Sequence, residues 1–162
     1  MLLYPVLFAL EKCSWYNGLL VQKKPGEVKA SLLMLFFMFA AVTAVSWGIF
    51  DKAYAAVAAI LMWGTGDAAA ALVGIPFGKH KVGFRPVNGQ KSWEGTAAML
   101  LVSFICGLAV FMLYCRFPFG KAILPALAGA VIGAAAELFS PSEYDTMTVP
   151  AAILAVLLLL PF

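Results

Sequence analysis

AYAAVAAILMWGTGDAAAALV, residues 53–73, is an apolar run in which Asp67 is the only charged side chain. An α-helix needs about 20 such residues to cross the roughly 30 Å hydrocarbon core of a bilayer. Outward from this run, Ala30–Phe50 and Gly95–Cys115 are equally long and apolar, and Ala122–Phe139 is slightly shorter. Val149–Phe162 is too short for a complete span, so a fifth span is predicted either to continue past the end of this sequence or to be tilted or incomplete.

The composition also indicates a membrane protein. Of the 162 residues, 64% are hydrophobic and only 12% are charged, which exceeds the apolar content of soluble domains. We therefore predict an all-α, polytopic integral membrane bundle with about four to five transmembrane helices, in a single membrane domain over residues 1–162. Residues 1–22 are predicted to form an interfacial helix or the end of a missing span, so the domain is expected to be truncated at one or both ends.

The distribution of basic residues predicts the orientation. Seven of the eleven lysines and arginines lie in segments 23–29 and 79–91. Two predicted membrane spans lie between these segments, so both segments are expected on the same side of the membrane. The positive-inside rule places that side in the cytoplasm. Segment 140–148 should then share it. In a bacterium, the chain would lie in the inner or cell membrane with these loops cytoplasmic.

Asp67 is the first candidate functional residue. A carboxylate at membrane depth costs a few kcal/mol unless a cation or a protein partner compensates for it. A divalent metal ion is one such partner, and the glycines and alanines around Asp67 would allow a ligand or another backbone to approach closely. The alternative is that Asp67 is hydrated near the interface or pairs with a lysine.

The segment after this run combines glycines with cations between residues 78 and 95. Exposed amides and cationic side chains are the combination that binds polyphosphate. Ser92 is predicted to cap the third span, so that an anion beside Lys91 would also meet the positive end of that helix. The alternative is a basic membrane anchor with turn-forming glycines.

Two acids farther along the chain, Glu137 and Asp145, are predicted to lie at the same end as Asp67 and Glu94. Mg²⁺ prefers carboxylate oxygens, and it would bridge these acids and nucleotide phosphates while lysines neutralise charge. His80 is the only histidine and there are three cysteines without CxxC spacing, which argues against a zinc or haem site.

Four stretches resemble, in order, the CTP-dependent lipid kinases, the family that includes dolichol kinase, phytol kinase and yeast-type diacylglycerol kinase. They are GDAAAALVG (66–74), FGKH (77–80), KSWEG (91–95) and AELFSPSEYDTMTVP (136–150). Phosphatidate cytidylyltransferases are related in pattern, but the last stretch is closer to the kinases. Thr146 departs from the kinase pattern, in which Asn usually follows the aspartate.

The resemblance implies phosphoryl transfer from CTP to a lipid alcohol such as a polyprenol, phytol or diacylglycerol, with Mg²⁺ as cofactor. Carried over by position, the implied catalytic residues are Asp67, Lys91 and Glu94. The implied nucleotide-binding residues are Gly66, Gly78, Lys79, His80, Lys81, Arg85, Lys91 and Ser92. The implied metal ligands are Asp67, Glu137 and Asp145.

Two other functions stay open at this stage. The first is a phosphatidate cytidylyltransferase, in which a lipid phosphate attacks CTP and pyrophosphate leaves. The second is a non-catalytic membrane scaffold with a basic surface loop. The expected partners are CTP, a lipid alcohol or lipid phosphate and membrane lipids, without nucleic acid. The small-residue face of the fourth segment would also allow a homo-oligomer.

Overall fold

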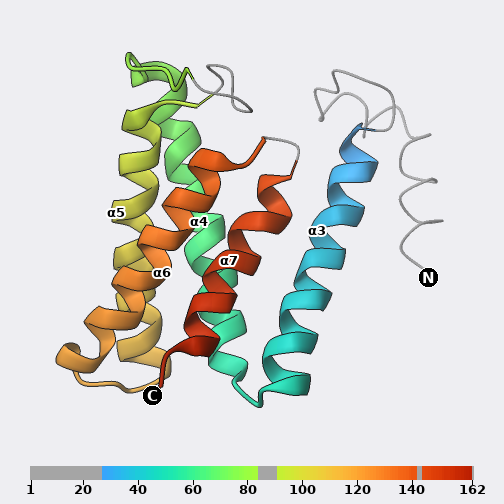
Figure 1. The fold of residues 1–162 in the computed structure, drawn as a ribbon, viewed down its shortest axis with the longest axis vertical. Coiled ribbons are helices and arrows are strands. Elements are labelled where there is room, and N and C mark those ends of the chain that lie inside the picture. The colour runs from blue at the N-terminus through green and yellow to red at the C-terminus, as the bar shows by residue number, and fades with distance from the viewer. Residues whose placement is uncertain (1–26, 84–90, 142–143, 162) are drawn as a thin grey trace. The chain divides into compact units, whose positions relative to one another are not determined.

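A computed structural model describes residues 27–83, 91–141 and 144–161 (Figure 1). Its elements are helices α3 (Glu27–Thr43), α4 (Ala53–Phe77), α5 (Trp93–Ala109), α6 (Phe119–Phe139) and α7 (Asp145–Leu159), with π-helices η1 (Ala44–Ile49) and η2 (Val110–Tyr114) continuing α3 and α5. The described residues contain no β-strand, only an isolated antiparallel bridge between Lys81 and Ser92. The all-α fold class is thus confirmed.

Four helical segments are long and apolar enough to cross a membrane. They are Ser31–Ile49, Ala53–Phe77, Trp93–Tyr114 and Phe119–Phe139, whereas α7 is an apolar helix of 15 residues. The polytopic architecture predicted from the sequence is confirmed at this level. The fourth span, expected to be slightly short, begins earlier than predicted because the extended Pro118 directly precedes the helix. The N-terminal segment 1–22 lies outside the described residues.

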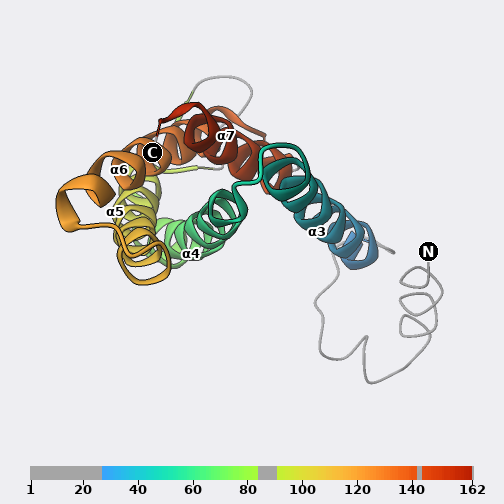
Figure 2. The ribbon, with the colours of Figure 1, turned by 90° about the horizontal axis from the view of Figure 1, so that it is seen from below.

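The chain divides into two compact units, residues 1–40 and residues 41–162. Within the first unit, the described residues 27–40 belong to α3. Within the second, α4 packs against α5 and α7, and α6 packs against the same two helices. Successive helices run antiparallel, and Figure 2 shows α4 to α7 arranged around a common interior. The second unit is therefore an antiparallel four-helix bundle.

Small residues let these helices approach closely. The Met62 side chain of α4 lies against Gly107 of α5 and Gly129 of α6, where an added Cβ would come within 3.0 Å and 2.7 Å of its Cε. A hydrogen bond also joins α4 and α5: the Ser103 Oγ donates to the Met62 carbonyl at 2.8 Å. Such packing is typical of helices whose association gains little from the hydrophobic effect.

One end of the bundle gathers the C-termini of α4 and α6 and the N-termini of α5 and α7 (Figure 1). Of the two connecting segments, the described residues 78–83 and 91–92 therefore lie at the same end as residues 140–141 and 144, as predicted, and α4 and α5 extend beyond the ends of α6 and α7 there. At the opposite end, Asp51 adopts a left-handed conformation (φ 54°) in the turn before α4. Lys52 Nζ donates a 3.2 Å hydrogen bond to the Leu158 carbonyl near the C-terminus of α7.

The packing of α4 on α5 predicts that Gly66→Ala is destabilising. The added methyl group would lie 2.2 Å from Ser103 Oγ and 3.0 Å from Met99 Cγ, so the helices must move apart. We expect a loss of about 1–3 kcal/mol, seen as a lower midpoint of thermal unfolding by circular dichroism in detergent.

Gly64→Ala is the matched control, because nothing lies within 4 Å of the added methyl group. It should leave the midpoint unchanged or raise it, since alanine is favoured over glycine inside a helix by up to about 1 kcal/mol. Equal midpoints for the two variants would contradict this account of the packing.

Candidate active site

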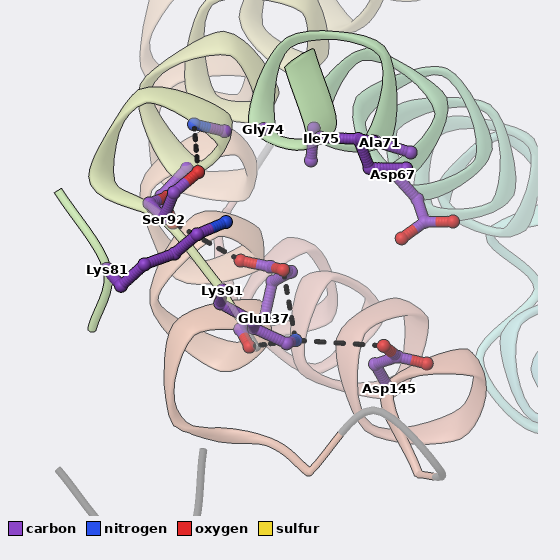
Figure 3. A pocket seen from close by; sticks show the side chains of 12 residues that line it. Asp67, Ala71, Gly74, Ile75, Lys81, Lys91, Ser92, Glu137 and Asp145 are labelled. Carbon is purple, nitrogen blue, oxygen red and sulfur yellow. Dashed lines mark hydrogen bonds and ion pairs between the residues drawn. The ribbon is translucent and has the colours of Figure 1, made fainter. Parts of the chain in front are cut away.

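A cavity of about 210 Å³ lies at the end of the bundle where α4 and α5 extend beyond α6 and α7 (Figure 3). Each of the four helices contributes to its wall, as does the segment between α4 and α5. The lining residues are Asp67, Ala70, Ala71, Gly74, Ile75, Lys81, Lys91, Ser92, Gly95, Thr96, Glu137 and Asp145. Six of the residues predicted from the sequence are thereby brought together: Asp67, Lys81, Lys91, Ser92, Glu137 and Asp145.

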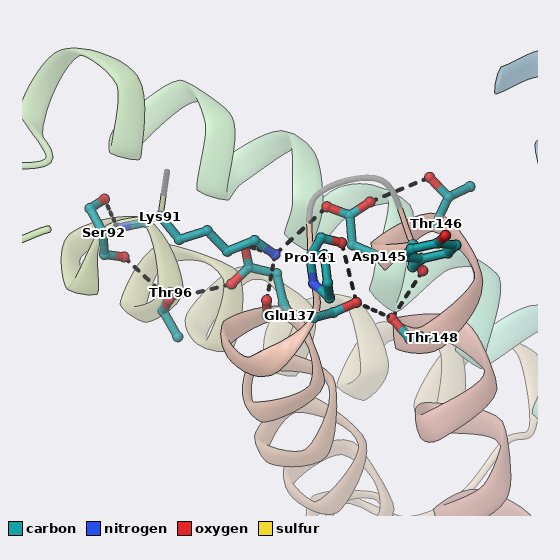
Figure 4. A network of polar contacts seen from close by, with 11 residues as sticks. Lys91, Ser92, Thr96, Glu137, Pro141, Asp145, Thr146 and Thr148 are labelled. Carbon is teal, nitrogen blue, oxygen red and sulfur yellow. Dashed lines mark hydrogen bonds and ion pairs between the residues drawn. The ribbon is translucent and has the colours of Figure 1, made fainter. Parts of the chain in front are cut away.

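Lys91 is the centre of a buried ionic cluster. Its ammonium lies 3.0 Å from Glu137 Oε1 and 3.6 Å from Asp145 Oδ2, and it also donates a hydrogen bond to the Glu137 carbonyl (Figure 4). The side chains of Lys91 and Glu137 are less than one-tenth exposed. An ion pair with so little access to water needs good geometry and further hydrogen bonds to offset its desolvation. The cluster ties α5, α6 and α7 together at the cavity.

The N-terminus of α5 supplies the next contacts. Ser92 caps the helix as predicted, since its Oγ accepts a 3.2 Å hydrogen bond from the Gly95 amide. Thr96, one turn later, donates to the Ser92 carbonyl at 3.2 Å and lies 3.4 Å from Glu137 Oε2. Thr96 therefore links the start of α5 to the acid on α6.

The segment before α5 is held against it by backbone pairing. Lys81 forms a bridge with Ser92, the Val82 amide donates to the Lys91 carbonyl at 2.9 Å, and the Trp93 amide donates to the His80 carbonyl at 3.1 Å. The Val82 side chain is buried, which anchors the segment. This pairing brings Lys81 to the cavity wall.

Glycines allow the backbone of α4 to approach the start of α5 near the bridge between Lys81 and Ser92. A Cβ on Gly78 would lie 2.3 Å from the Gly74 carbonyl oxygen and 2.6 Å from Ser92 Oγ. A Cβ on Gly95 would lie 3.0 Å from the Ala70 carbonyl oxygen. At these positions the absence of a side chain allows α4 to contact the start of α5 directly.

Asp67 faces the cavity from α4 (Figure 3). Ten residues separate it from the end of α4 at Phe77, which is about 15 Å along the helix. Among the residues that the structure describes, its carboxylate has no hydrogen-bond or ion-pair partner, whereas Glu137 and Asp145 both contact Lys91. Asp67 is thus the acid in the cavity whose oxygens are available to a ligand.

The charges in the cavity are unbalanced. Three carboxylates (Asp67, Glu137, Asp145) and two ammonium groups (Lys81, Lys91) face it, so one net negative charge remains when all are ionised. Burial raises the pKa of the Asp145 carboxyl at the start of α7, and the nearby Lys91 ammonium acts in the opposite direction. Within the described ranges, no three histidine, cysteine or acidic residues lie close enough together to hold a metal ion. In this conformation the Lys91 ammonium is the cation that contacts Glu137 and Asp145.

Several other predicted site residues lie away from the cavity lining. Gly66 packs against Ser103 of α5, and Gly78 packs against Ser92. Lys79 is exposed on the segment outside the cavity. His80 Nδ1 pairs with Glu94 Oε1 at 2.6 Å, and both Glu94 oxygens accept from the His80 amide.

Arg85 lies outside the described residues. The roles predicted for these residues in nucleotide binding or catalysis stay predictions.

The sequence analysis expected small residues around Asp67 to admit a ligand, but it missed which of them form the cavity wall, and it missed Thr96. Ala70, Ala71, Gly74 and Ile75 follow Asp67 at three, four, seven and eight residues, which is the spacing of one helix face. That spacing was visible in the sequence. Thr96 follows Ser92 by one turn, but nothing in the sequence indicates that it faces Glu137.

One comparison with known proteins gives a match. The chain is 40% identical over 94 residues to a phytol kinase from Synechocystis sp., a match that covers 56% of this chain. The same match covers 38% of the length of that phytol kinase. No family model matches the sequence, and no solved structure matches it significantly. The similarity supports a relationship to the lipid and polyprenol kinases.

Proposed function

We propose that this chain is part of a membrane-embedded kinase that transfers a phosphoryl group from CTP to a lipid alcohol in the presence of Mg²⁺. The observation that carries the proposal is the cavity, which the unpartnered Asp67 carboxylate lines together with Lys81 and the buried Lys91–Glu137–Asp145 cluster. The partial similarity to a phytol kinase and the motif resemblance support the same reaction class.

The surroundings of the cavity favour an acceptor that arrives from the bilayer. Beyond Asp67, the last turns of α4 present the exposed apolar side chains of Leu72, Ile75 and Phe77, and Ile75 also lines the cavity. A lipid alcohol could keep its chain against this apolar surface while its hydroxyl group reaches Asp67. The cytoplasmic orientation of this end rests on the distribution of basic residues and stays a prediction.

The chemistry requires a base or a metal ligand at the hydroxyl group. In the proposed reaction the lipid oxygen attacks the terminal phosphorus of CTP, a new O–P bond forms, and the bond to the bridging oxygen breaks to release CDP. The hydroxyl proton passes to a basic group, for which Asp67 is placed with free oxygens. Asp67 would need its negative charge equally if it held the metal ion.

The chemistry of the acids suits Mg²⁺, because carboxylate oxygens are its preferred protein ligands. Asp67, Glu137 and Asp145 would hold it after moving closer together, since in the described conformation they do not lie close enough to share a metal ion. When bound, Mg²⁺ would neutralise phosphate charge and orient the terminal phosphoryl group. The net negative charge of the cavity would repel phosphate, and bound Mg²⁺ would reverse that charge. The choice of CTP over other nucleotides rests on the motif resemblance.

Asp67→Asn should abolish the reaction, because it removes the charge while keeping the shape of the side chain. We expect a fall of about 10²–10⁴-fold in the transfer of label from γ-labelled CTP to lipid, followed by thin-layer chromatography with diacylglycerol, undecaprenol, dolichol and phytol as acceptors. Asp51→Asn is the matched control at the opposite end of the bundle. Asparagine tolerates the left-handed conformation of that residue, so its activity should equal that of the native chain.

The other outcomes of this assay are also informative. Release of labelled pyrophosphate when phosphatidate is supplied, without labelled lipid, would replace the kinase by a cytidylyltransferase. Equal activity of Asp67→Asn and the native chain would contradict the role proposed for Asp67. Absence of any transfer with native protein that is folded and supplied with Mg²⁺ would contradict the kinase proposal for this chain.

Lys91→Met tests the ionic cluster by its effect on stability. Removing the ammonium leaves Glu137 and Asp145 without their counter-ion, so we expect a loss of about 3–5 kcal/mol in the free energy of unfolding. The midpoint of thermal unfolding in detergent should fall well below that of Lys121→Met, which removes an exposed lysine at the other end. Adding Glu137→Gln to Lys91→Met should recover part of the loss, and a purely additive further loss would contradict the cluster.

A further inference from the structure

The two lysines of the cavity differ in what surrounds them. Lys91 is almost completely buried and its ammonium already contacts two carboxylates and a carbonyl oxygen. Lys81 is exposed and, within the described part of the chain, its ammonium has no carboxylate partner. From this difference we infer that Lys81 is the cation that binds the phosphates of the ligand, and that Lys91 is a positioning residue that holds Glu137 and Asp145.

Lys91 is poorly suited to bind phosphate directly. Turning its ammonium toward a ligand would break the 3.0 Å contact with Glu137 and leave a buried carboxylate without a counter-ion. That loss is costly, because a buried charge that loses its partner keeps its full desolvation penalty. The Lys91 ammonium therefore contributes most by staying in place, where it keeps the acids of α6 and α7 at the cavity.

The backbone of Lys81 is fixed beside the cavity before any ligand binds. The bridge to Ser92 and the hydrogen bond between the Val82 amide and the Lys91 carbonyl fix its Cα beside the start of α5. Its side chain lines the cavity (Figure 3), and no internal contact must be broken before its ammonium meets a ligand. Because the backbone of Lys81 is already fixed, the main cost of binding an anion is the conformational entropy that its side chain loses.

The neighbouring helix end defines the ligand class. Lys81 pairs with the residue that caps α5, so its ammonium lies near the positive end of that helix dipole. Ser92 and Gly95 at this helix end also line the cavity. A lysine and a helix N-terminus beside three carboxylates suit a polyphosphate carried in with a divalent cation. This inference rests on the proposed function and assigns the phosphate contact within it.

Inorganic pyrophosphate with Mg²⁺ is the probe, because it carries the phosphates without the base, the sugar or the lipid. Binding to the detergent-solubilised full chain is measured by isothermal titration calorimetry. Lys81→Met should weaken binding by roughly 10- to 100-fold, the usual effect of losing one charge-assisted hydrogen bond, and should leave the unfolding midpoint unchanged. Lys81→Arg should retain most of the affinity, and Lys121→Met, which removes an exposed lysine far from the cavity, should bind as the native chain does.

Two results would overturn the inference. One is equal affinity of the native chain and Lys81→Met for pyrophosphate, and the other is no binding of pyrophosphate by the native chain. The proposed kinase activity fails by a different result, namely pyrophosphate binding that depends on Lys81 without any transfer of label to a lipid alcohol. The two failures are therefore distinguishable.

Discussion

The close approach of α4 and α5 is the constraint on which the site depends. Gly66 brings α4 against Ser103, and Gly95 brings the start of α5 against the backbone of α4 near Ala70. Without these contacts the two helices would stand farther apart, and the bridge between Lys81 and Ser92 would lose its support. The position of Lys81 beside α5 thus depends on glycines, which carry no functional group. In lipid this is expected, because helix association relies on packing more than on burial from water.

The ionic cluster completes the site by joining the remaining helices to this pair. Lys91 precedes α5, Glu137 lies near the end of α6, and Asp145 begins α7. A single ammonium between two acids therefore fixes three helix ends relative to one another. It also gives two largely buried acids a counter-ion, without which their desolvation would be costly. Structure and proposed chemistry use the same residues here, so substitutions at Lys91 must be interpreted through stability as well as activity.

Much of the fold could be predicted from the sequence because long apolar runs allow few alternatives to spanning helices. Counting the crossings was enough to predict that the end of α4 and the start of α7 lie at the same end of the bundle. The acids at 67, 137 and 145 could be predicted to converge for the same reason. The different roles inferred for Lys81 and Lys91 could not be predicted, because helical periodicity does not indicate that Lys91 is buried and Lys81 exposed. The pairing of Glu94 with His80 also depends on the backbone pairing of residues 80–82 with residues 91–93, which no sequence pattern specifies.

The unequal lengths of the helices at the site end have a consequence for the membrane itself. Where α6 and α7 stop, polar groups such as Asp145 begin, whereas α4 continues past this level with Leu72, Ile75 and Phe77 exposed. In a bilayer, helices of such unequal length would make the boundary between water and hydrocarbon stepped rather than flat around this end of the bundle. Asp67, which lines the cavity at this end, would then be within reach of both a lipid headgroup and a water-soluble anion under the proposed function.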